Sequence, residues 1–336
     1  MKSKKKKKYI SLLILSSIIT TSLTHKACQI AQNGYVSVAY NINKETIIKK
    51  TDKKKPNQYA SFYENIFNNS LKLPIEEEMV PQGITKMNEY ILLSFYDNTS
   101  KHNSCIYTLD KEGKKINRCF LDSKAHVGSV AYDKNNDLVW IPGPSGKLNA
   151  YLASDFLEKE NTTPIYSNAD IGVNLPNYMK PWNNSISYLC IFHNNLYVGN
   201  FSLFKNGLVK QYNINNTSNK EITLTYIREF KVPTKVQGLT FYETKDKNYI
   251  LFSRSFGEFT PSIIQIFPYN IEIDDYTKQE LPSISYPAPS MIEQITTEED
   301  KLYLIFESFS TKFKYCQDKT NDIYILDNKK LIKNLK

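Results

Sequence analysis

The chain has 336 residues, of which 41% are hydrophobic and 23% are charged, and its formal net charge is +9. The positive excess lies near the N-terminus, because residues 1–27 hold seven lysines and no acid, and residues 44–55 add four net positive charges, so the remaining chain is slightly acidic. A nucleic-acid surface needs a concentrated positive field on the folded body. Only three arginines occur, and we therefore expect no nucleic-acid partner.

The first 27 residues have the pattern of a signal peptide. Lys2 and Lys4 to Lys8 precede an uncharged, mostly apolar run from Tyr9 to Leu23. This run is shorter than the ~20 residues that cross a bilayer as a helix. The pattern predicts cleavage and export to the extracellular side, with no transmembrane span in the mature protein. Cys28 follows Ala27 and leaves lipoprotein processing open as an alternative, although His25 stands where that signal has an apolar residue.

Residues 28–70 are expected to form an N-terminal tether. Their lysines are interpreted as a solvated connection at the cell surface, with adhesion to an anionic envelope as the alternative. We expect the rest of the chain, residues 71–336, to fold as one domain, and we expect a monomer.

Five stretches repeat one pattern, in which a polar residue opens an apolar strand, a tight polar turn follows, and a second apolar strand ends in a polar or aromatic cluster. They are Gln82–Tyr96, His126–Gly143, Ile186–Phe201, Gln237–Phe256 and Glu293–Phe309. Their starts lie 44 to 60 residues apart, which suits a repeated four-stranded sheet. The sequence predicts an all-β fold, a single β-propeller with five blades of four antiparallel strands.

Three parts of the ring are harder to assign. The fourth strand of blade four is predicted at Ile271–Ile273. Blade five lacks a clear outer strand, which either Leu331–Leu335 or Tyr35–Tyr40 could supply to close the ring. The 60-residue step through Asp155–Asn184 leaves room for an additional element.

The five cysteines are Cys28, Cys105, Cys119, Cys190 and Cys316. Strands on either side of a Lys111–Gly113 hairpin loop would place Cys105 opposite Cys119. A cross-strand disulfide and two half-buried free thiols are both compatible with that register.

Two polar clusters are expected at one mouth of the central channel. The first comes from the starts of innermost strands, with His126 placed on the same strand face as the others: Gln82, His126, Gln237 and Glu293. The second comes from the ends of the second strands: Tyr96, Asn200, Arg254, Ser255 and Glu307, with Ser94 and Ser308. Longer connections gather on this face, where propellers usually bind ligands. A channel lined by polar groups that only hold water is the structural alternative.

Several sequence runs resemble a group of exported bacterial β-propeller proteins without an assigned activity. The runs are Val80-Pro-Gln-Gly-Ile-Thr, Ala125-His-Val-Gly-Ser-Val-Ala, Tyr197-Val-Gly-Asn-Phe, Val236-Gln-Gly-Leu-Thr-Phe and Ile305-Phe-Glu-Ser. Asn200 stands where that group often has Glu, and Ser129 where it has Gly. The resemblance implies the fold and export only.

Two functions from different classes follow. The first is an exported protein that binds a small polar or glycan-like ligand through Gln82, His126, Gln237 and Arg254, with Tyr96 as an aromatic wall. The second is a hydrolase or lyase in which Glu293 and Glu307 form a carboxylate pair and His126 is the general acid or base. No cofactor is required, although Ca²⁺ could bridge the two carboxylates.

Overall fold

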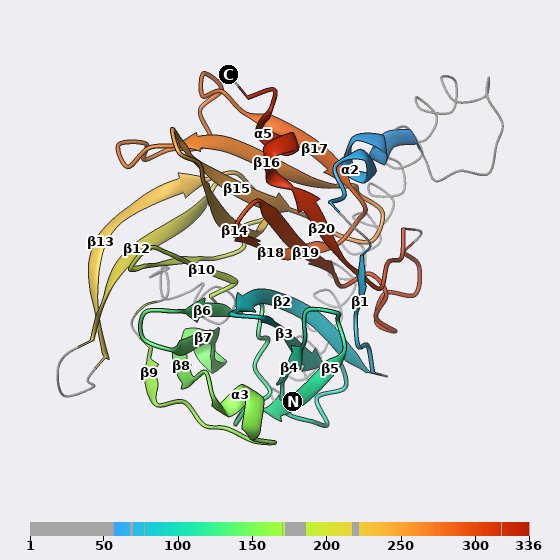
Figure 1. Cartoon of the computed structure of the whole chain (residues 1–336), viewed down its shortest axis with the longest axis vertical. Helices are drawn as coiled ribbons and strands as arrows, with labels where there is room; N and C mark the ends of the chain where they lie inside the picture. Colours follow the sequence, from blue (N-terminus) through green and yellow to red (C-terminus); the bar gives the residue numbers. More distant parts are fainter. Residues whose placement is uncertain are drawn as a thin grey trace, which may run out of the picture. The chain divides into compact units, whose positions relative to one another are not determined.

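Five antiparallel sheets of four strands are arranged as the blades of a propeller (Figure 1). The computed structural model describes residues 57–67, 70–76, 78–169, 171, 186–216, 222–316 and 318–335. The predicted fold class, with its five blades of four strands, is confirmed. The expected signal peptide and the Tyr35–Tyr40 segment lie outside the described residues.

In blades 1 to 4 the strands follow the chain from the innermost to the outermost position, whereas the outermost strand of blade 5 is β1. Blade 1 comprises β2 (Met79–Met87), β3 (Tyr90–Asp97), β4 (Cys105–Leu109) and β5 (Lys115–Phe120). Blade 2 comprises β6 (Ala131–Asp133), β7 (Leu138–Pro142), β8 (Leu148–Leu152) and β9 (Tyr166–Asn168). Blade 3 comprises β10 (Tyr188–Phe192), β11 (Asn195–Gly199), β12 (Gly207–Asn216) and β13 (Ile222–Val232). Blade 4 comprises β14 (Val236–Glu243), β15 (Asn248–Arg254), β16 (Ser262–Tyr269) and β17 (Ile284–Ala288). Blade 5 comprises β18 (Ile292–Glu298), β19 (Lys301–Phe306), β20 (Asp322–Asp327) and β1 (Leu71–Lys72).

The ring closes through blade 5, which takes strands from both ends of the described chain. β1 pairs with β20 in the register Leu71 to Ile323 and Lys72 to Asp322. Of the two segments considered for this outer strand, Leu331–Leu335 is wrong, because the chain turns there into α5 (Asn328–Ile332) and β1 takes the position. The Asp327 carboxylate accepts a hydrogen bond from the backbone N–H of Lys330 and caps that helix.

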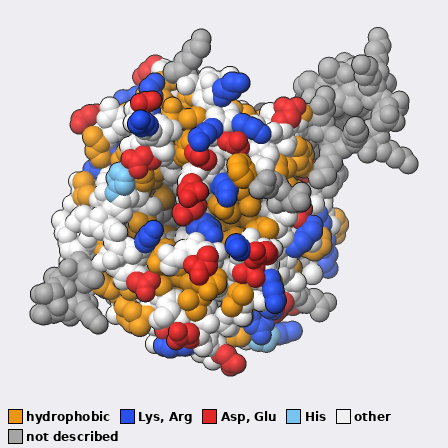
Figure 2. All heavy atoms as spheres, in the orientation of Figure 1, with side chains coloured by type: hydrophobic (Ala, Val, Ile, Leu, Met, Phe, Trp, Pro, Cys, Tyr) orange, Lys and Arg blue, Asp and Glu red, His pale blue; other side chains and the backbone are white. Residues whose placement is uncertain are grey.

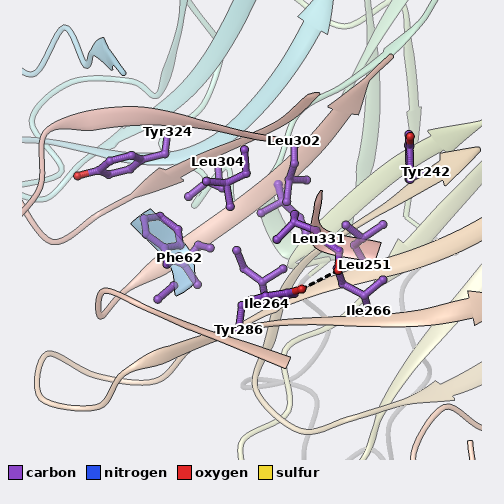
Figure 3. Close-up of a cluster of buried hydrophobic side chains, with 14 of the residues drawn as sticks. Phe62, Tyr242, Leu251, Ile264, Ile266, Tyr286, Leu302, Leu304, Tyr324 and Leu331 are labelled. Atoms are coloured by element: carbon purple, nitrogen blue, oxygen red, sulfur yellow. Dashed lines mark hydrogen bonds between the residues drawn. The ribbon is translucent and has the colours of Figure 1, made fainter. Parts of the chain in front are cut away.

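Residues before β1 also pack on the propeller. The short helices η1 (Asn57–Tyr59) and α2 (Ala60–Glu64) place Tyr59 and Phe62 in the core, where both are buried. Phe62 packs between blades 4 and 5 with Leu304, Tyr324 and other apolar side chains (Figure 3). In the same cluster the Tyr286 hydroxyl donates to the backbone carbonyl of Leu331 at 2.7 Å, which joins α5 to β17.

Two predicted strands differ from the structure. The fourth strand of blade 4 is Ile284–Ala288 rather than Ile271–Ile273, because residues 270–276 turn back along β13 and form an isolated bridge between Lys231 and Asp275. The innermost strand of blade 2 begins at Ala131, so His126 lies in the connection before the strand and not on its face. The Asp155–Asn184 segment does contain an additional element, the short helix α3 (Asp155–Glu158).

The predicted register between Cys105 and Cys119 is wrong by one residue. Cys105 pairs with Phe120, and Cys119 pairs with Ile106, because an irregularity near Leu109 adds one residue to β5. Neighbouring residues of a strand point to opposite faces, so the two thiols lie in different apolar clusters. Both are free, as are Cys190 and Cys316, while Cys28 lies outside the described residues.

No helix among the described residues is long and apolar enough to cross a membrane. On the face drawn in Figure 2, acidic and basic side chains are interspersed rather than separated into fields of one sign.

Candidate functional site

Three innermost strands carry a β-bulge at the same position, and each bulge directs a polar side chain to the mouth of the ring. In β2 the register shifts between Pro81 and Gly83, which leaves Gln82 as the additional residue. In β14 the corresponding residue is Gln237, and in β18 it is Glu293. A bulge bends its strand and re-aims a side chain. The structure therefore brings these three polar residues to equivalent positions of three adjacent blades.

The residue after each bulge lies close to the neighbouring blade. A Cβ on Gly83 would lie 2.8 Å from the backbone of Ser129 and Val130, and a Cβ on Gly238 would lie 2.8 Å from the Cα of Gln294. Only glycine fits such approaches without a shift of the backbone. The glycines in the two Gln-Gly pairs thus serve the packing between blades, while the glutamines serve the mouth.

In blade 5 this position holds Gln294, whose amide joins three other blades. Its Oε1 accepts from the backbone N–H of Ile84 at 2.8 Å and of Val130 at 2.9 Å. Its Nε2 donates to the backbone carbonyls of Val130 at 2.9 Å and Leu189 at 3.1 Å. The side chain is 2% exposed. Gln294 therefore crosses the centre of the ring and forms a floor beneath the mouth.

Above this floor, four side chains form a continuous network across blades 4, 5 and 1. The Gln237 amide donates to Glu293 Oε1 at 3.5 Å, and the Gln82 amide donates to Glu307 Oε2 at 2.9 Å. Glu293 and Glu307 lie between these amides, and each carboxyl affects the pKa of the other. We call the four residues the mouth tetrad. Gln82 and Glu293 are only 1% and 4% exposed, so the tetrad is desolvated from below.

The two carboxyl groups of the tetrad favour protonation. Burial raises the pKa of Glu293 well above its ordinary value, and the nearby Glu307 carboxylate raises it further. Burial likewise raises the pKa of Glu307, although its hydrogen bonds to Glu293 and Gln82 and the Lys312 ammonium oppose the shift. Two neighbouring carboxyls do not both ionise readily, and such a pair titrates as a unit that shares one proton over a range of pH. One group is then an acid and the other a base.

An aromatic wall stands beside the tetrad. The rings of Tyr96 and His126 lie 4.5 Å apart at an interplanar angle of 39°. Burial raises the pKa of the Tyr96 hydroxyl, as do Glu307 and Glu293, which places this phenol near the carboxyl pair. The His126 side chain is exposed to solvent, and partial desolvation by neighbouring groups together with the Lys312 ammonium lowers the pKa of its imidazole to about 4. At neutral pH it is uncharged.

Lys312 is a residue of the mouth that the sequence analysis did not identify. It lies in the long connection between β19 and β20, and its Nζ donates to the Tyr96 hydroxyl at 2.5 Å. A lysine in a loop carries no positional signal, because the contact depends on a fold of residues 307–321 that no repeat specifies.

The remaining predicted site residues make other contacts. Arg254 donates to the backbone carbonyl of Thr234 at 2.9 Å and to Gln265 Oε1 at 2.8 Å, so these contacts link its guanidinium to blade 4 rather than to the carboxyl pair. Ser255 is buried, and its hydroxyl accepts from Ser262 at 3.1 Å. Asn200, at the end of β11, keeps its Oδ1 buried without a partner.

Blade 3 departs from the pattern of the other blades. Its innermost strand begins with Tyr188, which is fully buried and whose ring covers Gly199 of β11 so closely that a Cβ there would overlap it. Because Tyr188 pairs with Gly199 as Gly83 pairs with Ser94 and Gly238 with Ser253, this ring stands at the position of the two glycines.

The described residues contain no group of three or more His, Cys, Asp or Glu side chains that could hold a metal ion. Two hollows occur elsewhere, near the turns between first and second strands. One of about 570 Å³ is lined by residues including Tyr242, Lys245 and Asp300, and one of about 370 Å³ by residues including Lys86, Glu298 and Phe67. Neither includes a residue of the mouth, and the larger volume reflects open concavity between surface loops rather than convergent chemistry.

Comparison with known proteins does not assign the chain to a family. Neither a protein-family model nor a curated protein matches the chain. Among solved structures, the WD40 repeats of RRP9 are similar at 8% identity and a TM-score of 0.42, over 77% of this chain and 97% of that one. The β-propeller domain of Cps50 (Swd1) from Myceliophteria thermophila is similar at 11% identity and a TM-score of 0.38, over 78% and 99%. A chain of a nidogen/laminin complex is similar at 10% identity and a TM-score of 0.37, over 73% and 85%.

Proposed function

We propose that this β-propeller is an exported protein that binds a small polar ligand at the mouth of its ring. The mouth tetrad carries the proposal. Two glutamine amides and two carboxyls converge there over the Gln294 floor, and Tyr96 supplies an aromatic side wall. A few convergent polar groups beside an aromatic surface are the usual composition of a small-molecule site. Export is proposed from the lysine-rich N-terminus and the apolar run that follows it.

A panel of neutral sugars, amino sugars and amino acids tests binding. Ligand-observed NMR and thermal unfolding would be recorded for the wild type, for Glu293→Gln, and for Lys314→Met as a control on the same face. The proposal predicts that at least one compound binds the wild type and Lys314→Met and raises their Tm, because a ligand of the folded state stabilises it. Binding that is unchanged in Glu293→Gln would place the ligand elsewhere, and a panel without any binder would contradict the proposal.

A hydrolase or lyase is the second candidate, favoured by one specific observation. The Glu293 and Glu307 carboxyls raise or modify each other's pKa, and both pKa values are raised, so the pair offers an acid and a base at once. His126 is neutral and can act only as a base at pH 7. Ester, amide and carbon–oxygen lyase substrates, whose cleavage uses an acid and a base, are the chemistry to assay.

Chromogenic esters, amides and uronides would be tested with the wild type and with Glu307→Gln. Removal of a general acid or base lowers the rate by about 100-fold or more. A turnover that Glu307→Gln leaves unchanged would contradict a catalytic role for the pair.

A further inference from the structure

The carboxyl pair of the mouth tetrad, in which Glu293 is buried and Glu307 is half-buried, has no cation bonded to it. Among the ion pairs of the described residues, none includes Glu293 or Glu307. Arg254 contacts its own blade instead. Buried carboxylates are normally paired with a cation or neutralised by a proton. With no cation beside the pair, the raised pKa values of both carboxyls favour neutralisation by a proton.

An ammonium group of the protein itself already lies at this mouth. Lys312 Nζ is 5.1 Å from the centre of the Tyr96 ring and 5.0 Å from that of the Phe313 ring, and it donates to the Tyr96 hydroxyl. Its charge lowers the pKa of Glu293 and Glu307 against the effect of burial. The mouth therefore has the aromatic surface and the negative potential that hold an ammonium group.

The side-chain oxygen of Gln82 also favours an ammonium ligand. The Gln82 side chain is 1% exposed, and its Nε2 is engaged by the Pro81 carbonyl and Glu307. Its Oε1 accepts no hydrogen bond from the described part of the chain. An ammonium group has three N–H donors, and the two carboxyls with this amide oxygen are three acceptors.

We propose that the mouth selects ligands that carry a primary ammonium group, which bonds to Glu293 and Glu307 and displaces their shared proton to water. The inference rests on the proposed function, because it concerns the same site. Lys312 competes for the same negative field. It lies on a surface loop, and a ligand that binds has to overcome its repulsion.

The first pair of matched probes is glucosamine and glucose, in which an ammonium group replaces a hydroxyl group. The second pair, propylammonium and propan-1-ol, makes the same comparison without the sugar. Ligand-observed NMR up to about 10 mM detects weak complexes of this kind. We expect glucosamine and propylammonium to bind and their neutral counterparts to bind at least about tenfold more weakly, as expected for a charge-assisted contact in a desolvated site.

Three variants test whether the preference for ammonium ligands arises at the mouth tetrad. Glu307→Gln is isosteric and should abolish the preference for the ammonium probes. Lys312→Met should strengthen their binding about two- to fivefold, as the removal of one exposed charge does. Lys314→Met, which removes an exposed lysine two residues further on, should leave binding unchanged. Far-UV circular dichroism of each variant checks that it is folded.

Proton release provides an independent readout. Calorimetry at one pH in two buffers of different ionisation enthalpy should show protons leaving the protein when an ammonium probe binds. The other titratable groups at the mouth are His126, Tyr96 and Lys312, with Glu258 nearby. The lowered pKa of His126 leaves its imidazole neutral near pH 6.5, and burial raises the pKa of the Tyr96 hydroxyl, so neither group accounts for a released proton. Binding without proton release would contradict displacement.

The outcomes separate the two proposals. If glucose binds as well as glucosamine and both are lost in Glu293→Gln, the mouth is a polar-ligand site and the ammonium preference is wrong. If neither ammonium probe binds at 10 mM while another polar compound of the panel does, the inference also fails and the proposed function stands. A preference that persists in Glu307→Gln would place ammonium recognition elsewhere.

Discussion

Glu293 and Gln294 are adjacent in one β-bulge, and their side chains have different roles. Glu293 joins the mouth tetrad, whereas the Gln294 amide crosses the ring to the backbones of Ile84, Val130 and Leu189. The bulge makes both possible, because two residues stand opposite Ile305 alone and their side chains need not follow the alternation of a regular strand. One irregularity therefore supplies the floor of the site and one of its acidic groups.

Replacement of Gln294 by methionine tests whether its amide hydrogen bonds stabilise the ring. The substitution keeps the volume but removes the side-chain partner of two buried N–H groups and of the Val130 carbonyl, while the Leu189 carbonyl keeps Ser129 Oγ at 3.4 Å. Each group left without a partner costs about 1–3 kcal/mol. We expect the free energy of unfolding, measured in urea, to fall by about 3 kcal/mol or more. Gln211→Met is the matched control, because Gln211 is also buried but accepts from Arg228 Nε through a single side-chain contact. Equal losses in the two variants would contradict the role of Gln294.

The N-terminal helix α2 is predicted to be essential for the closure of blade 5. Phe62 is fully buried against Phe306 and Tyr324, with ring centroids 6.2 Å and 5.2 Å away. Phe62→Ala should lower the free energy of unfolding by about 3–5 kcal/mol, as large-to-small changes in a core do. Phe204, which is 89% exposed, provides the control, and Phe204→Ala should change stability by less than about 0.5 kcal/mol. A small effect of Phe62→Ala would show that the segment before β1 does not hold the ring.

The pH dependence of stability has a predicted sign. The pKa values of Glu293 and Glu307 are raised in the folded state, so the folded protein binds more protons than the unfolded chain above the ordinary glutamate pKa. Their contribution to stability is therefore complete below that pKa and is lost as the pH rises through the folded-state values. We expect the difference in urea midpoint between wild type and Glu293→Gln to shift in favour of the variant as the pH rises from about 4.5 to 8. A difference that is constant across this range would contradict the raised pKa.

Added Ca²⁺ should leave the melting temperature unchanged. The mouth offers two carboxyls that favour a proton, and the Lys312 ammonium opposes a second cation, whereas Ca²⁺ takes six to eight oxygen ligands. A Tm that rises with millimolar Ca²⁺ and falls again with chelator would contradict this account and would support the bridging cation considered from the sequence.

The blade repeat could be predicted from the sequence because it depends on local patterns. Apolar strands and short polar turns recur in every blade, and the alignment of Gln82, Gln237 and Glu293 follows from the strand starts. The structure places these three residues in equivalent bulges. The sequence also predicted that Glu307 lies at the same mouth as these residues. The start of an innermost strand and the end of the second strand lie at the same edge of the ring.

Other features depend on contacts that one sequence does not encode locally. Leu71 and Lys72 form too short a strand to be recognised, and only their pairing with β20 defines them. The Cys105 register failed because one bulged residue near Leu109 shifts the alignment. Gln294 appeared to be an ordinary strand residue, and its role depends on three distant blades.

The most direct test of the account is a pH titration of the glutamate side-chain carboxyl carbons by ¹³C NMR. Glu293→Gln and Glu307→Gln assign the two resonances. The account predicts that both groups of the wild type titrate above the ordinary glutamate pKa of about 4.3 and that each substitution changes the titration of the other group. Two independent titrations near the ordinary value would show that the carboxyls do not share a proton, and would contradict the central claim.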